Sequence, residues 1–147
     1  MHQTYHAHGV QFRFPSSWEL SEQSRGNEAA ITVESPETSF WSLWLFFDCP
    51  TPQRVLETAV SALEQDYDEI DVYPVEARMC RRESLARDVE FVCLELINSA
   101  FLRAFQTDDF TALVFYQGTD HELERTRPIL EGICKSLQWD GDQSPGS

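Results

Sequence analysis

The sequence predicts an α+β domain with three layers, α/β/α, in which a mostly antiparallel central sheet of six to eight strands lies between two main helices. Three observations predict this class. Many short segments carry apolar residues at the two-residue period of a strand, or on both faces of one. Two longer segments place apolar residues three and four positions apart, as one face of a helix does. Short links of turn-forming residues join the later strands, which favours antiparallel neighbours.

The first strands are predicted near the start of the chain. Apolar and polar residues alternate through segment 10–14 (VQFRF), which is typical of a strand with one buried face. The turn residues of segment 15–17 (PSS) close this strand. Residues 18–20 (WEL) then begin a second strand, and segment 30–33 (AITV) is predicted to be a third.

Segment 39–50, SFWSLWLFFDCP, is rich in aromatic residues. Two tryptophans and three phenylalanines occupy eight consecutive positions there. A strand over 40–47 would have no polar face, so it is predicted to be a central strand that is covered on both sides. An aromatic platform for nucleic acid would need basic neighbours, but the nearest charged residues are Glu37 and Asp48. Trp41 or Trp44 could still line a groove between the sheet and a helix.

The first helix is predicted over residues 52–67. Thr51 is a suitable N-cap, and Pro52 suits the first helical position because its missing N–H group needs no partner there. Apolar residues follow at spacings of three and four. Segment 70–78 (IDVYPVEAR) then reads as a strand, and Pro74 places this strand at an edge or a bulge because proline cannot donate to a sheet.

The second half of the chain predicts an antiparallel meander and a final helix. The longest strand is expected over 87–97, with a turn at residues 98–99 into segment 100–106 and a turn at 107–109 into segment 110–117. Asp120 is the candidate N-cap of the last helix, which is expected to break near Pro128. The apolar residues of segment 129–137 lie on one helical face.

The chain is predicted to form one domain over residues 1–140, with a disordered tail over 141–147 (GDQSPGS). The first fifteen residues have no basic start and no apolar run of signal-peptide length, and no segment is apolar enough to insert into a membrane. The four cysteines are at least thirteen positions apart, with no CxxC pair, which favours reduced thiols. A cytoplasmic location is therefore expected.

The composition argues against some partners. The 147 residues include 11 Lys and Arg against 25 Asp and Glu, which gives a formal net charge of −14. Such a charge repels the phosphate backbone of nucleic acid and anionic lipid head groups. Nucleic acid is therefore not expected as a partner, and membrane insertion is not expected either. The sequence does not indicate the oligomeric state.

The chain resembles a known superfamily. The opening segment 9–20, GVQFRFPSSWEL, looks like the apolar strand, proline, small turn and tryptophan that begin PsbP-like proteins, and the order of strands and helices up to ICKSLQW at 133–139 is similar. The PsbP-like superfamily includes a photosystem extrinsic protein, Mog-type Ran-binding proteins and bacterial DcrB-like effector chaperones. The resemblance implies a binding or adaptor protein without an enzyme active site. It assigns no contact residue to this chain.

Two groups of residues are candidate metal ligands. His6 and His8 would share one face of a strand, with His2 nearby, but no carboxylate or thiol at matching spacing completes a site. The acidic run 66–71 (DYDEID) lacks the turn glycine and the distant glutamate of a calcium loop. We expect the histidines to lie on a solvated edge strand. We expect the acidic run to be the end of a helix that continues into a solvated loop. No metal and no cofactor is predicted.

A thiol and an arginine group were the other candidates. Cys49 precedes a helix start, where a thiolate can be stabilised, but Asp48 opposes this and only the fold could bring a base such as His121 near it. Arginines at positions 78, 81, 82 and 87 are the only basic concentration, and they suit an anion or the local acids. No phosphate loop, dinucleotide fingerprint, nucleophile elbow or metalloprotease motif occurs. The sequence therefore predicts no catalytic residue.

Two functions remain open from the sequence. The first is a non-enzymatic protein-binding, adaptor or chaperone module whose uncovered sheet surface holds an apolar segment of a partner. The alternative is a small-ligand binder or enzyme that uses a pocket between the sheet and helix 52–67. For this alternative, Glu90, Glu95 and His121 are the residues of interest, since two lie on the long strand and one begins a helix.

Overall fold

The computed structural model describes residues 1–143 and has an α+β fold. The strands are β1 (His2–Ala7), β2 (Val10–Pro15), β3 (Glu19–Arg25), β4 (Glu28–Glu34), β5 (Phe40–Phe46), β6 (Ile70–Met79), β7 (Arg82–Cys93), β8 (Leu96–Gln106), β9 (Thr111–Thr119) and β10 (Gln138–Trp139). The helices are α1 (Pro52–Asp66), α2 (Asp120–Ser136) and the short 3-10 helix η1 (Asp140–Gln143).

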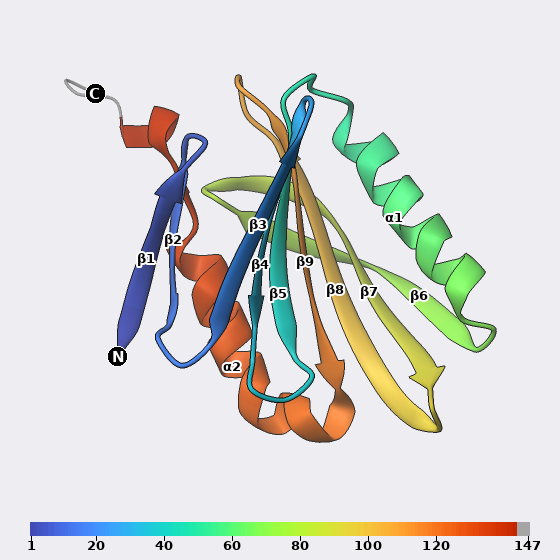
Figure 1. Ribbon diagram of the computed structural model, residues 1–147. Coiled ribbons are helices and arrows are strands. Elements are labelled where there is room, and N and C mark those ends of the chain that lie inside the picture. The colour runs from blue at the N-terminus through green and yellow to red at the C-terminus, as the bar shows by residue number, and fades with distance from the viewer. Residues whose placement is uncertain (144–147) are drawn as a thin grey trace.

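The strands form two sheets, whereas the sequence predicts a single central sheet. The large sheet has seven strands in the order β3-β4-β5-β9-β8-β7-β6, and every neighbouring pair is antiparallel. The small sheet has the order β1-β2-β10. The hairpin of β1 and β2 stands apart from the large sheet in Figure 1, and the other edge of β2 pairs with β10, where Gln138 lies opposite Gln11.

Two hydrophobic cores lie on opposite faces of the large sheet. One core joins the sheet to α2 and the small sheet, and it includes Phe12, Trp41 and Leu130. The other joins the sheet to α1, and it includes Leu56 and Leu102. Figure 1 shows α1 beside β6 to β8 and α2 behind the strands. Side chains alternate between the faces of a strand, so β5, β6, β8 and β9 contribute to both cores, whereas β3 and β4 contribute only to the first and β7 only to the second.

The turn between β7 and β8 lies earlier than the sequence predicts. Cys93 pairs with Leu96, so the two turn residues are Leu94 and Glu95, and both have positive φ angles of 52° and 67°. Segment 98–99 lies inside β8. A two-residue turn with positive φ at both positions normally has Asn-Gly or a similar pair. Leucine and glutamate carry no such signal. The single strand predicted over 87–97 therefore covers the end of β7, the turn and the start of β8.

The last helix also differs from its prediction. Its N-cap is Thr119 and not Asp120, because the side chain of Thr119 accepts a hydrogen bond from the backbone of Glu122. The helix continues through Pro128 to Ser136 without the predicted break. Buried residues on both sides of the proline, among them Thr126 and Leu130, hold the two halves on the sheet. Their burial compensates for the hydrogen bond that proline cannot donate.

Three local predictions about α1 and β6 are confirmed. Thr51 caps α1 by accepting from the backbone of Arg54, Pro52 is the first helical residue, and β6 with Pro74 is an edge strand. The tail predicted over 141–147 begins with a helical turn. Asp140 and residues 141–143 form η1, and residues 144–147 lie outside the described residues.

In residues 1–143, no helix is long and apolar enough to cross a membrane.

Candidate functional site

Helix α1 covers only part of the sheet face on which it packs. It contacts β7, β8 and β9, which form one half of the sheet. Within the described chain, no helix lies in front of β3, β4 and β5 in Figure 1. The face of β3 to β5 that points to the same side as α1 is therefore open, and we call it the open face.

Strand β5 shows what this arrangement does to the aromatic segment. Trp41, Leu43 and Leu45 point toward α2 and are fully buried. Trp44 points to the other side and is 39% exposed. The prediction that β5 is covered on both sides is thus wrong for one face, because α1 packs over the other half of the sheet. Trp44 lines a groove between sheet and helix, and Trp41 does not.

The groove lies along α1 and has a volume of about 560 Å³. Its apolar lining comes from Trp44, Phe46 and Leu113 of the sheet and from Val55, Ala59 and Ala62 of α1. The pairing of β5 with β9 places Trp44 directly opposite Leu113. The rings of Phe40 and Phe115 stack with their centroids 5.7 Å apart on this same side of the sheet. The apolar surface on this side is therefore largely limited to β5 and β9, because the residues of β3 and β4 that point the same way are mostly polar, among them Glu19, Gln23 and Glu34.

The turn before α1 determines where the helix starts relative to β5. The backbone of Cys49, at a positive φ of 54°, donates to the carbonyl of Phe46 at 3.2 Å. The buried hydroxyl of Thr111 donates to the carbonyl of Pro50. These bonds attach the start of α1 to the ends of β5 and β9. Three ionisable residues, Glu28, Asp48 and Arg54, also line the groove, all near the start of α1, so the groove is apolar with one charged end. Such a surface can bind an apolar segment.

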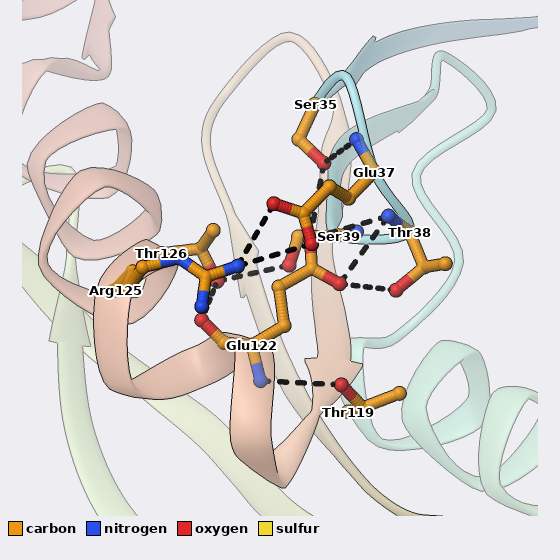
Figure 2. A network of polar contacts seen from close by, with 8 residues as sticks. All are labelled: Ser35, Glu37, Thr38, Ser39, Thr119, Glu122, Arg125 and Thr126. Carbon is orange, nitrogen blue, oxygen red and sulfur yellow. Dashed lines mark hydrogen bonds and ion pairs between the residues drawn. The ribbon is translucent and has the colours of Figure 1, made fainter.

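A second polar arrangement joins α2 to the loop between β4 and β5, as Figure 2 shows. Glu122, at the start of α2, is only 3% exposed. Its carboxylate accepts hydrogen bonds from the backbone of Ser39 at 2.9 Å and from the backbone and hydroxyl of Thr38. The hydroxyl of Ser35 also donates to it at 3.2 Å. The carboxylate is therefore occupied by donors of its own chain.

These hydrogen bonds decide the ionisation of Glu122. Burial opposes the charged form and acts to raise the pKa. The donors of Thr38 and Ser39 outweigh burial, so the pKa of Glu122 lies below its ordinary value. An ionised carboxylate with its acceptor sites filled is a poor proton acceptor for a substrate. The position of Glu122 therefore indicates a structural role.

Sequence reasoning missed Glu122, although a signal was present. Thr119 and Glu122 have the spacing of a capping box, in which a glutamate follows a threonine N-cap by three residues. The sequence predicts Asp120 as the N-cap because aspartate is also common at that position. Here the glutamate bonds to a distant loop and not to its own N-cap. That long-range partner has no sequence pattern.

The structure does not bring Cys49 and His121 together. Cys49 follows the end of β5, whereas His121 follows the end of β9. These strands are antiparallel, with Phe40 opposite Gln117 and Phe46 opposite Thr111. The two residues therefore lie beyond opposite ends of the β5–β9 pair, about 20 Å apart at the rise of a strand. His121 therefore cannot act as a base for Cys49 in this structure.

The other residues considered for a ligand-binding or enzyme site are dispersed. Glu90 is exposed on β7, Glu95 lies in the β7–β8 turn, and His121 is exposed on α2. Of the histidines, His6 pairs with Asp140 at 3.0 Å on the surface. The acidic run 66–71 spans the end of α1 and the start of β6. Within residues 1–143, no three His, Cys, Asp or Glu side chains are grouped in a way that could hold a metal ion.

The four arginines of segment 78–87 have different surroundings. Arg78 pairs with Glu83 at 2.6 Å, as expected for a surface ion pair. Arg82 makes two bonds to Asp142, at 2.9 and 3.1 Å, and lies over the ring of Trp139. Arg87 donates to the carbonyl of Ala86. A local acid thus pairs with Arg78, as expected, whereas the partner of Arg82 lies sixty residues later in the chain.

The cysteines are expected to differ in their reactivity with an alkylating reagent. Burial raises the pKa of Cys134 to about 11 and also raises the pKa of Cys80. At pH 7 roughly one Cys134 in ten thousand is then a thiolate, which is the reactive form. All three of Cys49, Cys93 and Cys134 are partly exposed, so labelling of the folded protein with iodoacetamide, followed by peptide mass spectrometry, should modify Cys134 last because of its raised pKa. Equal rates for Cys134 in the folded and urea-unfolded protein would contradict this expectation.

Comparisons with known proteins give a likeness of structure. No family model matches the sequence, and no curated protein does. The cyanobacterial PsbP protein CyanoP from Synechocystis sp. PCC 6803 has a similar structure, with a TM-score of 0.62 at 10% identity over 94% of this chain and 92% of that protein. LpqN of Mycobacterium tuberculosis, described as involved in cell envelope biogenesis, has a TM-score of 0.53 at 11% identity over 94% of this chain and 90% of LpqN.

A protein from Bacteroides thetaiotaomicron is also similar, with a TM-score of 0.60 at 11% identity over 95% of this chain. The chain spans about half of that protein's length, 47%. Identities this low show the fold and carry no residue role from one protein to another. The order and pairing of the strands, the two helices and these three structures lead to one conclusion, which is that the chain has a PsbP-like fold.

Proposed function

We propose that this protein is a non-enzymatic protein-binding module, of the adaptor or chaperone kind, that holds an amphipathic segment of a partner in the groove beside α1. The observation that carries the proposal is Trp44. It is a large aromatic side chain on an inner strand of the sheet, and 39% of it is exposed. Tryptophan is among the residues that most often contribute the largest share of binding energy at protein interfaces.

The groove favours a helix with basic flanks as its occupant. Its floor is apolar along the length of α1, which matches the helix-in-groove mode of peptide recognition. Two acids, Glu28 and Asp48, line it against one base, Arg54, and the whole chain carries a formal charge of −14. Basic residues beside the apolar face of a partner helix would therefore be attracted to the groove. A cytoplasmic location is part of this proposal, and four free cysteines support it.

The small-ligand or enzyme alternative has less support. Glu90, Glu95 and His121 do not line the groove. The polar side chains that do line it are the three ionisable residues named above and Thr58 on α1. A ligand site would normally combine an apolar pocket with convergent polar groups and a perturbed pKa. The groove follows α1 from Pro50 to Ala62, and this elongated shape suits a chain segment better than a small molecule.

The proposal predicts that a charge at position 44 abolishes partner binding. The tagged protein would be used to capture partners from a lysate of its own host, and the eluted complexes would be measured by native mass spectrometry. A stoichiometric protein partner is expected with the wild type. With Trp44→Lys, capture should fall by at least about tenfold, because the central apolar contact is lost and a buried charge is introduced.

Leu94→Lys is the matched control. Leu94 lies in the β7–β8 turn, is 91% exposed and does not line the groove. This variant makes the same change from an apolar residue to lysine at a different surface and should retain the partner. Retention of the partner by Trp44→Lys, or its loss from both variants, would count against the groove. A small-molecule adduct without any protein would favour the alternative function.

A further inference from the structure

A pocket separate from the groove lies between the β6–β7 turn and the end of α2. It has a volume of about 350 Å³. Met79, Cys80 and Arg81 line it from the turn, and Lys135 lines it from the last turn of α2. Leu137 adds apolar surface just after the helix. The pocket therefore brings together segments more than fifty residues apart in the sequence.

The basic side chains around this pocket are unusual in so acidic a chain. The sequence has 11 Lys and Arg against 25 Asp and Glu, yet Arg78, Arg81 and Lys135 all line this one pocket. Glu83 pairs with Arg78 at 2.6 Å. In the part of the chain that the structure describes, Arg81 and Lys135 have no carboxylate partner. Two positive charges are therefore available to a bound anion.

The negative charge in the lining is compensated by an arginine. The one carboxylate that lines the pocket, Asp142, is bound to Arg82 by two hydrogen bonds at 2.9 and 3.1 Å. The thiols of Cys80 and Cys134 also line it, and burial raises the pKa of each. Both thiols are therefore neutral at pH 7.

The backbone presents Arg81 at an energetic cost. Cys80 and Arg81 form the two-residue turn between β6 and β7, and both have positive φ angles of 52° and 68°. Asparagine and glycine adopt this turn with little strain, whereas arginine does not. A guanidinium nitrogen of Arg78 donates to the carbonyl of Arg81 at 3.1 Å and helps to hold the turn. Strained positions that the surroundings maintain are often found at functional sites.

We propose that this pocket binds a small organic carboxylate, with its carboxylate between Arg81 and Lys135 and a short hydrocarbon chain against Met79 and Leu137. The forked donors of arginine suit a carboxylate, and lysine adds a second point charge. The apolar lining favours an anion with a hydrocarbon body over a bare inorganic ion. The site is independent of the groove beside α1, so it stands whether or not a partner protein binds there.

Titration with hexanoate tests the site. Binding to the full chain would be followed by calorimetry and by NMR shifts of the amides of segments 78–82 and 134–138. Saturable binding is expected with the wild type. Arg81→Gly should weaken it at least about tenfold, since an ion-paired hydrogen bond is lost. The same variant should raise the unfolding temperature, because glycine relieves the strained φ. Loss of binding then cannot be attributed to loss of folding.

Arg25→Ala is the matched control, because Arg25 is an exposed arginine at the end of β3 and does not line the pocket. It should bind hexanoate as the wild type does. Three results would each overturn the proposal: no saturable binding below about 10 mM, undiminished binding by Arg81→Gly, or equal binding of hexanol, which has the hydrocarbon chain without the charge. Binding of inorganic phosphate as tight as that of hexanoate would overturn the assignment of the apolar contacts.

Discussion

Replacement of Glu122 with alanine is expected to lower the free energy of unfolding by about 2 to 4 kcal/mol. The carboxylate accepts bonds from the backbone of Thr38 and Ser39, and Ser39 is buried. Removal of the acceptor leaves the N–H of Ser39 without a partner in the interior, which costs more than the loss of a bond at the surface. Urea unfolding followed by circular dichroism measures the change. Glu124→Ala, on the exposed side of α2, should change the stability by less than about 0.5 kcal/mol.

The effect of Glu122 should depend on pH in a defined direction. Its pKa is lowered in the folded protein, so its contribution to stability is complete above the ordinary value of 4.5 and is lost as the pH falls through the folded pKa. The difference in unfolding free energy between the wild type and Glu122→Gln should therefore be constant near neutral pH and shrink below about pH 4.5. A difference that grows on acidification would show that the carboxylate is not bound in its charged form.

Replacement of Trp41 with alanine is expected to lower the free energy of unfolding by about 3 to 5 kcal/mol. Trp41 is fully buried, and its ring lies 4.7 Å from that of Phe12 in the small sheet. Its indole N–H donates to the sulfur of Cys134 on α2 at 3.3 Å. The side chain therefore packs the large sheet, the small sheet and α2 together. A cavity at this position would loosen all three contacts.

Trp44→Ala is the matched comparison, because it makes the same substitution three residues later on the same strand. Trp44 points away from the core that Trp41 fills and is 39% exposed. Its replacement should cost roughly 1 kcal/mol, well below the cost at position 41. Equal losses of stability in the two variants, measured by the same urea titration, would mean that the open face is covered in solution.

The sequence predicted those elements whose signals are local. The start of α1 was predicted correctly because Thr51 and Pro52 specify a helix start within two residues. The edge position of β6 followed from Pro74. The small sheet could not be predicted, because β10 is two residues long and pairs with a strand more than 120 residues earlier in the chain. No periodicity can be recognised in so short a strand.

The candidate groove was predictable only in part. Two-faced apolar composition correctly indicated that β5 is an inner strand of the sheet. Whether Trp41 or Trp44 is exposed depends on which strands α1 lies over, and that follows from the connection between α1 and β6. The charges of the second pocket were visible as an arginine group, but Lys135 joins Arg81 only through the packing of the β6–β7 turn near the end of α2. The spacing of residues along the sequence does not show which distant segments pack together.

The position of β9 between β5 and β8 has a consequence for synthesis on the ribosome. β5 ends at Phe46, but its second partner is not complete until Thr119 has been made. Synthesis proceeds at about 5 to 20 residues per second, so one edge of β5 stays unpaired for about 4 to 15 s after the strand has been made. During this interval β5 is a hydrophobic strand with a free hydrogen-bonding edge, which is the condition for association with other nascent chains. Cellular yield of the protein should therefore be sensitive to codon choice between residues 47 and 119.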